Sequence, residues 1–287
     1  MYNTLITHIH RGAVAILVDC SLSMKSLTLF HNTVLSKQEV GFIVANHIIE
    51  ELIIRCARRK RMRDYFDIAA IGYSGTEAYS LLGDYGDGFV KAIRLAEERP
   101  QPCTIYLRQQ LRDGTMTDAP IIVYPWVKTS ASGASPMYDG LARTKMLVNE
   151  WCKDSDNRNS FPPLIFHITD GACSDAHPRD LCDISYDLRN MSTTDGNALF
   201  ITLLLSTYGE HNEPCEIYPE DYLYASCDRD RELMCKMSSL IPNVLEPHLS
   251  HLIARRGGGP YRALALNYSP CSILSIINIG SISTYTR

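Results

Sequence analysis

The chain has 287 residues, of which 45% are hydrophobic and 21% charged, with a formal net charge of −4. Its 17 Gly and 14 Pro exclude collagen-like and low-complexity chains, and the slight acidity argues against a global electrostatic affinity for nucleic acid or anionic membranes. A chain of this length can form one or two domains.

Ten cysteines stand singly along the chain, and no C-x-x-C pair is present. This pattern argues against a zinc ribbon or a thioredoxin-like motif and favours reduced thiols. The first apolar run, residues 13–18, is short and ends at Asp19, so it does not have the pattern of a signal peptide. Other apolar runs are too short to span a bilayer. We expect a soluble, cytoplasmic protein with no membrane partner.

Strands and helices are predicted to alternate along the chain. Continuous apolar runs with β-branched residues predict strands buried on both faces, as in a parallel sheet, and they occupy residues 13–18, 67–73, 164–169 and 199–205. Helices are predicted at residues 38–55, 139–152 and around 185–190. This order predicts an α/β fold, a Rossmann-like three-layer αβα sandwich around a central, mostly parallel sheet.

Two parts of the chain depart from this alternation. Residues 76–134 are rich in turn signals and predict an elaboration at one edge of the sheet, and residues 248–287 predict a packed C-terminal extension. Short apolar runs within these parts lie at residues 104–107, 121–123, 263–266 and 273–279. We therefore expect a single domain over residues 1–287, with its core at about residues 12–247.

A D-x-S-x-S pattern follows the first predicted strand directly. Its members, Asp19, Ser21 and Ser23, place a carboxylate and two hydroxyls at alternating positions of one turn. Hard oxygen ligands of this kind suit Mg²⁺ or Mn²⁺. Taken alone, the pattern fits equally an Asp that caps a helix and two ordinary turn serines.

Two further segments strengthen the metal interpretation. Ser135 stands just before Pro136, which can start the next helix at its first position. Asp170 ends another predicted central strand and is followed by Gly171, which permits a tight turn. Polar residues that follow the strands of such a sheet gather at one edge, where these folds build their binding sites.

With these three segments, the chain resembles a von Willebrand factor type A domain with a metal-ion-dependent adhesion site. By that resemblance, Asp19, Ser21 and Ser23 form the first loop of the site, Ser135 replaces the family's Thr, and Asp170 is the Asp of the third loop. Ser for Thr keeps the hydroxyl and loses the β-methyl group. The resemblance runs from about Gly12 to the 240s.

The resemblance implies a protein-binding module that is not an enzyme. It implies Mg²⁺, or Mn²⁺ or Ca²⁺, as the bound ion, and a Glu or Asp of a protein partner at the open coordination position. Two carboxylates leave a divalent ion close to neutral, so an acidic ligand is not strongly repelled. The T-D-G and S-P-M-Y-D-G-L stretches are similar to bacterial cytoplasmic members associated with tellurium resistance, which implies a scaffold or regulatory role in a stress response. The oligomeric state stays open.

Three alternatives remain at this point. A phosphoesterase could use Asp19 as its nucleophile, although such enzymes carry D-x-D and this chain has Ser21 at the second position. An RNA-binding module could use the basic segment, residues 55–63, but no aromatic residue interleaves it. A solvated helix end explains the same charges, and we expect no nucleic-acid partner. The third alternative is a degenerate site that keeps the fold and binds no ion.

Neighbouring polar residues are interpreted structurally. His167 lies inside a buried strand and is predicted to be a hydrogen-bonded core residue rather than a ligand. Asp175 follows Asp170 closely and is either a loop cap or a contact to the ligands. Tyr138 and Asp139 are predicted to begin a helix.

Overall fold

The computed structural model describes residues 1–30, 32–58, 61–110, 113–209, 216–220, 229–249 and 259–267. Within these ranges, parallel strands with long apolar runs form the middle of one sheet. They are β1 (Gly12–Asp19), β6 (Phe66–Ser74), β11 (Leu164–Thr169), β14 (Leu199–Leu204) and β16 (Leu264–Leu266). Shorter strands extend the sheet by antiparallel pairing, namely β7 (Glu77–Ser80), β8 (Val90–Lys91) and β15 (Glu216–Ile217).

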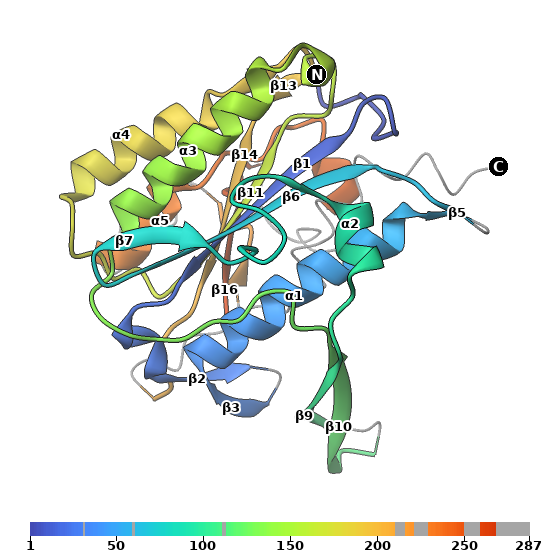
Figure 1. Cartoon of the computed structure of the whole chain (residues 1–287). Coiled ribbons are helices and arrows are strands. Elements are labelled where there is room, and N and C mark those ends of the chain that lie inside the picture. The colour runs from blue at the N-terminus through green and yellow to red at the C-terminus, as the bar shows by residue number, and fades with distance from the viewer. Residues whose placement is uncertain are drawn as a thin grey trace.

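The order of this sheet is β15-β16-β14-β11-β1-β6-β7, and β8 also pairs with β6. β1 therefore lies centrally, between β11 and β6, and is parallel to both. All the parallel strands end at the same edge (Figure 1). The expected α/β architecture with a mostly parallel central sheet is confirmed.

Helices cover both faces of the sheet (Figure 1). One face carries α1 (Lys37–Cys56) and α2 (Ala92–Glu97), and the other carries α3 (Met137–Lys153), α4 (Pro178–Arg189) and α5 (Arg229–Met237). α1 begins at a capping box, in which the Ser36 side chain accepts from the backbone N–H of Glu39 and the Glu39 carboxylate accepts from the backbone N–H of Ser36. These bonds pair N–H groups that the start of a helix otherwise leaves unpaired.

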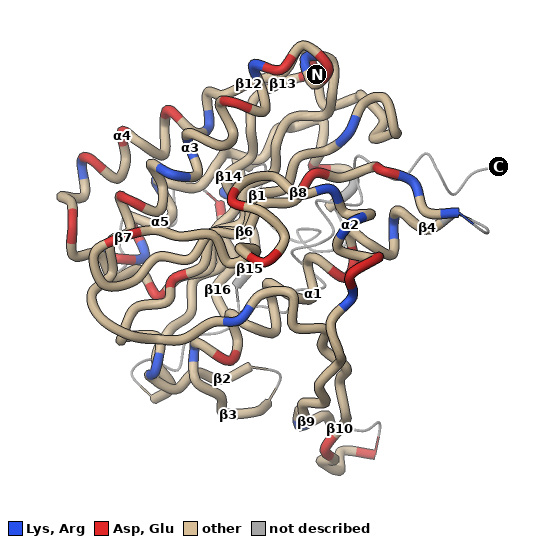
Figure 2. Tube along the Cα trace, in the orientation of Figure 1, with Lys and Arg blue, Asp and Glu red and all other residues tan. Residues whose placement is uncertain are grey.

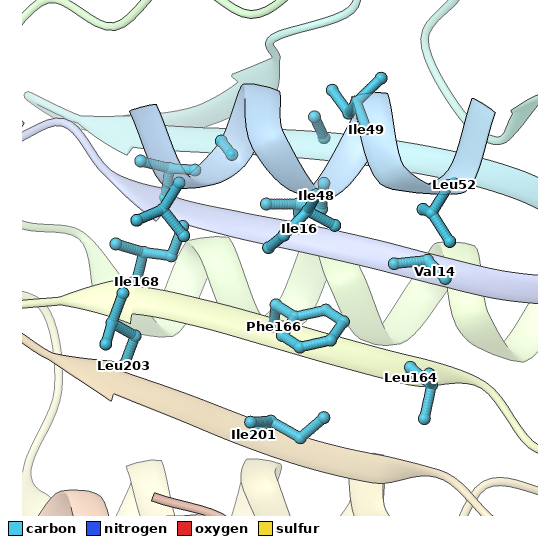
Figure 3. Packing of buried hydrophobic residues seen from close by; sticks show 14 of the residues in the cluster. Val14, Ile16, Ile48, Ile49, Leu52, Leu164, Phe166, Ile168, Ile201 and Leu203 are labelled. Carbon is cyan, nitrogen blue, oxygen red and sulfur yellow. The ribbon is translucent and has the colours of Figure 1, made fainter. Parts of the chain in front are cut away.

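The core lies on both faces because successive residues of a strand point to opposite sides. Val14 and Ile16 of β1 belong to the apolar cluster beneath α1, whereas Leu17 belongs to the cluster beneath α3. Figure 3 shows Ile16 opposite Ile48 of α1, with Phe166 of β11 alongside. Burying a large aliphatic side chain contributes about 1.5–3 kcal/mol, so this packing holds α1 in place over the strands.

Small hairpins and short 3₁₀ helices decorate this body. The hairpins are β2–β3 (Leu27–Phe30, Thr33–Ser36), β4–β5 (Ala57–Arg58, Arg61–Met62), β9–β10 (Cys103–Gln110, Met116–Val123) and β12–β13 (Ser192–Thr193, Gly196–Asn197). The 3₁₀ helices are η1 (Leu22–Lys25), η2 (Ser155–Asn157) and η4 (Glu246–Leu249). The β9–β10 hairpin projects away from the helices and the sheet (Figure 1).

Several predicted elements are confirmed with extended bounds. The helices predicted at 38–55 and 139–152 are α1 and α3, and the one around 185–190 is the C-terminal half of α4. The two strand-like runs within residues 76–134 are parts of β9 and β10.

The C-terminal part of the chain was expected to form an extension outside the core, but part of it belongs to the central sheet. The run at 263–266 contributes β16, which lies inside the sheet between β14 and β15, so the sheet reaches past the expected core boundary at residue 247. The run at 273–279 lies outside the described residues. None of the described helices has the length and apolar character needed to cross a membrane.

Candidate metal centre

Three loops meet where β1 and β11 end and α3 begins. The first loop, residues 19–26, is tied to the second, residues 130–136, by backbone hydrogen bonds from Leu22 N–H to Gly133 O (2.9 Å) and from Ser132 N–H to Cys20 O (2.8 Å). The second is tied to the third, residues 170–177, by a bond from Ser174 N–H to Ser135 O (2.8 Å). These backbone bonds bring together polar side chains that lie far apart in the sequence.

Asp19 is the centre of this meeting point and is 1% exposed. Its Oδ1 accepts from the backbone N–H of Ser21 at 2.8 Å. Its Oδ2 lies 3.1 Å from the Thr169 hydroxyl, which donates to it, and 3.3 Å from the Ser135 hydroxyl. The Asp19 carboxylate therefore contacts the first loop at Ser21, the second loop at Ser135, and Thr169, which immediately precedes Asp170 of the third loop.

The Ser135 hydroxyl has one proton and two acceptors. Its Oγ lies 2.7 Å from the carbonyl oxygen of Ala172 and 3.3 Å from Asp19 Oδ2. Because a hydroxyl donates a single proton, Ser135 can serve only one of these acceptors at a time. When the proton goes to Ala172, a lone pair of Ser135 Oγ is free to act as a ligand beside Asp19 Oδ2.

The hydroxyls of Ser21 and Ser23 lie 3.0 Å apart, one buried and the other half-buried. Ser21 also hydrogen-bonds to the Asp19 carboxylate, and Ser23 is linked to Asp19 through Ser21. Between them, Leu22 points outward and is 54% exposed. The D-x-S-x-S turn thus offers three oxygen side chains and one exposed apolar side chain.

Asp170 completes the predicted set but is already paired. Its Oδ1 accepts from the backbone N–H of Ala172 at 3.1 Å, and its Oδ2 lies 3.1 Å from Nζ of Lys37. The Lys37 and Asp170 side chains are 6% and 5% exposed. A lysine that the sequence does not point to therefore neutralises one of the two candidate carboxylates.

The site carries buried negative charge at Asp19. Burial raises the pKa of Asp19 to about 6, because the charged form has been removed from water. Hydrogen bonds from Ser21 and Thr169 lower that pKa, while the charge of Asp170 raises it. A nearby cation stabilises the charged form of such a buried carboxylate more than it stabilises an exposed one.

Beneath the site lies a buried polar pair. Tyr73, which pairs with Asp19 across β1 and β6, has its hydroxyl 2.8 Å from Nε2 of His167. Burial lowers the pKa of His167 to about 3 and raises that of Tyr73 well above its ordinary value, with the charge of Asp19 adding to the effect on Tyr73. The prediction of a hydrogen-bonded core histidine is confirmed.

Glycines allow the close approaches that shape the site. Gly133 has φ +66°, and a Cβ there would lie 2.8 Å from the Cα of Gly75, so a side chain would force the second loop away. Gly140 brings α3 against the sheet, since a Cβ there would lie 2.7 Å from Cδ1 of Tyr73. The first approach places the loop of Ser135 against the end of β6, and the second lets α3 pack on Tyr73.

Asp175 caps α3. Its two carboxylate oxygens accept from the backbone N–H groups of Tyr138 and Asp139, both at 3.0 Å. This resolves the open choice for Asp175 in favour of a helix cap, which links the third loop to the start of α3. Tyr138 and Asp139 lie in the first turn of α3, as predicted, but Pro136 is its N-cap and not its first helical residue.

All five predicted ligands are therefore in the loops that meet at this edge. The sequence interpretation missed Thr169, Lys37 and Tyr73. Thr169 is the last residue of a strand whose end had been singled out, so alternation along the strand offered a signal. Lys37 and Tyr73 depend on pairings between segments distant in sequence, which no local pattern reveals.

The donor set fits a hard divalent cation. It consists of two carboxylates and three serine hydroxyls, all oxygen, as Mg²⁺ and Ca²⁺ require. In the described part of the chain, no three or more His, Cys, Asp or Glu side chains gather as a group, so the hydroxyls are indispensable to any such site. Cys20, beside Asp19, is a buried free thiol.

The basic segment lies at the other end of α1. Arg55 forms an ion pair with Glu51 at 3.5 Å in the last turn of α1, and Arg61 is exposed on β5, while Arg59 and Lys60 lie outside the described residues. Figure 2 shows basic positions in blue near β4, at the opposite end of α1 from β2 and β3. The segment is thus separate from the candidate metal centre.

Comparison with known proteins yields little. No family model matches the chain, and no curated protein matches it. Among solved structures, the chain is similar to proximal thread matrix protein 1 (PTMP1) from the mussel byssus, with a TM-score of 0.37 and 13% identity over 69% of this chain. The chain spans about 37% of the length of that protein. At this level of similarity, neither fold family nor function transfers between the two proteins.

Proposed function

We propose that the chain is a protein-binding domain of the von Willebrand factor type A kind, whose binding depends on a divalent cation. The observation that carries the proposal is the pair formed by Asp19 Oδ2 and Ser135 Oγ, 3.3 Å apart where three loops meet. Asp19, Ser135 and Asp170, with the hydroxyls of Ser21 and Ser23, would hold the ion. The oxygen donor set favours Mg²⁺, with Mn²⁺ or Ca²⁺ as substitutes.

When bound, the cation supplies a positive centre to which a carboxylate oxygen of a partner can bind. The residues of the chain hold and orient that centre. Thr169 and the Ser21 N–H fix the Asp19 carboxylate, and the buried Tyr73 closes the site from below. A Glu or Asp of the partner is the ligand that this chemistry selects.

Exposed apolar side chains around the site support a protein as the partner. Leu22 lies between the two candidate serine ligands, and the adjoining hairpin exposes Leu27, Leu29 and Val34. Apolar side chains around a buried polar contact are typical of protein interfaces. We propose binding without bond cleavage, because the position that serves as acid or base in D-x-D phosphatases is Ser21 here. The free thiols support a cytoplasmic setting.

Calorimetric titration with Mg²⁺ and Mn²⁺ tests the metal site. We expect binding to the wild type and none to Asp19→Asn. Asp67→Asn is the matched control, because Asp67 is also a buried carboxylate but lies at the start of β6, bonded to Arg11 and Trp151. It is about 20 Å from Asp19 along the strands. Equal heats in wild type and Asp19→Asn would contradict the proposal.

A second measurement tests the partner. Proteins retained by the immobilised chain in Mg²⁺ should be released by EDTA, retained by Asp67→Asn and not retained by Asp19→Asn. Substituting individual Glu and Asp residues of the retained protein should then locate one whose loss abolishes binding. Retention that is indifferent to EDTA would refute cation-dependent recognition.

A further inference from the structure

The ion pair of Lys37 and Asp170 sets this site apart from a simple oxygen cradle. The ammonium lies 3.1 Å from Asp170 Oδ2, and both side chains are almost fully buried. In such a position water screens the charges weakly. The pair joins the first residue of α1 to the loop that follows β11, across 133 positions of sequence.

The backbone fixes where Lys37 stands. Its N–H donates to Ser26 O at 2.9 Å, which attaches the start of α1 to the first loop. The capping box between Ser36 and Glu39 sets the direction in which α1 leaves that loop. Lys37 is therefore placed between the first and third loops by the same contacts that build the site.

Three residues determine the net charge of the site, namely Asp19, Asp170 and Lys37. Asp19 and Asp170 in their ionised forms contribute two negative charges, and the ammonium of Lys37 contributes one positive charge. A divalent cation that uses Asp170 must share that carboxylate with Lys37 or displace it, and the two cations repel each other. With Lys37 in place, the loaded site keeps a net positive charge, which attracts an acidic ligand.

Building on the proposed function, we propose that Lys37 is an internal counter-ion that competes with the divalent cation for Asp170 and so holds the cation affinity of this chain low. Lys37 acts through Asp170 and is a positioning residue, not a ligand. A site tuned in this way favours the cation together with an acidic partner over the cation alone.

Calorimetric titration with Mg²⁺ tests this inference on wild type, Lys37→Met, Lys37→Gln and Lys37→Arg. Lys37→Met and Lys37→Gln remove the positive charge and should tighten Mg²⁺ binding by at least about tenfold. Lys37→Arg keeps the charge and should bind Mg²⁺ with the wild-type affinity. Lys25→Met is the matched control, since Lys25 is an exposed lysine at the end of η1 in the same loop. Circular dichroism verifies the fold, and the polar Lys37→Gln serves if Lys37→Met does not fold.

The outcomes separate this inference from the proposed function. Tighter binding in Lys37→Met and Lys37→Gln than in Lys25→Met supports competition for Asp170. If the wild type binds Mg²⁺ and the Lys37 variants bind it with the same affinity, the inference is overturned and the metal site stands. The same holds if Lys25→Met tightens Mg²⁺ binding as much as the Lys37 variants do. Binding by the Lys37 variants alone supports the inference and overturns cation-dependent binding by the native chain. Absence of binding in every variant overturns both.

Discussion

The hydroxyl of Thr169 donates to Oδ2 of Asp19 across 3.1 Å, so the last residue of β11 orients the last residue of β1. The same hydroxyl accepts from the backbone N–H of Gly171 at 3.0 Å. One threonine therefore fixes both the central carboxylate and the turn that carries Asp170.

Replacing Thr169 by Val should weaken the site and the fold together. The change leaves a buried carboxylate oxygen without one donor and a buried N–H without its acceptor, which costs about 1–3 kcal/mol. We expect a lower free energy of unfolding in urea and weaker Mg²⁺ binding. Thr202→Val removes a buried hydroxyl from the adjacent strand, where it is bonded to Ser238. This control should lose stability with unchanged Mg²⁺ affinity.

Because of Asp19, the metal-free protein should be more stable in mild acid than at neutral pH. Its pKa in the folded chain, about 6, lies above the ordinary value of 3.8, so the folded state binds more protons than the unfolded state between these two values. The stabilising contribution is complete below pH 3.8 and is lost as the pH rises through about 6. Mg²⁺ affinity should change in the opposite direction, falling below about pH 6 as protons compete for Asp19.

The Asp19→Asn variant isolates this effect. Urea unfolding in EDTA between pH 4 and 7 should show that the variant gains stability relative to wild type as the pH rises. At pH 7 the gain should be about 1–3 kcal/mol, because a buried charge has been removed. A difference between wild type and variant that does not depend on pH would contradict this account of Asp19.

His167 should remain neutral in the folded protein throughout the physiological range. Its pKa of about 3 lies below the ordinary value of 6.5 because burial penalises the charged ring. This depressed pKa contributes stability that is complete above pH 6.5 and is lost as the pH falls towards 3. The NMR signals of its ring should not move between pH 5 and 8, whereas in urea they should titrate near 6.5. A titration in the folded protein within that range would show that the ring reaches water.

Gly133→Ala should displace the loop that carries Ser135. A methyl group there would meet the Gly75 backbone at 2.8 Å in addition to the strain of a positive φ. Gly75→Ala is the control, because Gly75 has a similar φ of +67° with nothing within 4 Å of the added Cβ. We expect Gly75→Ala to cost about 1 kcal/mol and Gly133→Ala distinctly more, with weaker Mg²⁺ binding in Gly133→Ala alone. Equal effects of the two substitutions would argue against the close approach.

Asp19 and Asp170 could be singled out because each follows a strand that local periodicity identifies, and Ser135 because it precedes a predicted helix. Asp19 and Asp170 come directly after apolar runs, and parallel strands bring their ends to one edge. The Lys37–Asp170 pair could not be predicted, since it depends on the packing of α1 across the sheet. The pairing of Tyr73 with Asp19 depends on strand register. β16 was placed outside the core because a three-residue strand has too short a pattern to be distinguished from a packed loop.

α1 has a consequence for how large a ligand can be. The helix starts at Lys37, in the candidate metal centre, and its 20 residues end at Cys56, which gives a length of about 30 Å. A ligand that reaches both Asp19 and the exposed Arg61 and Arg63 needs an extended segment of about nine residues. A partner with a shorter binding segment contacts only one end of α1. α1 thus sets a separation of about 30 Å between the candidate metal centre and the basic segment.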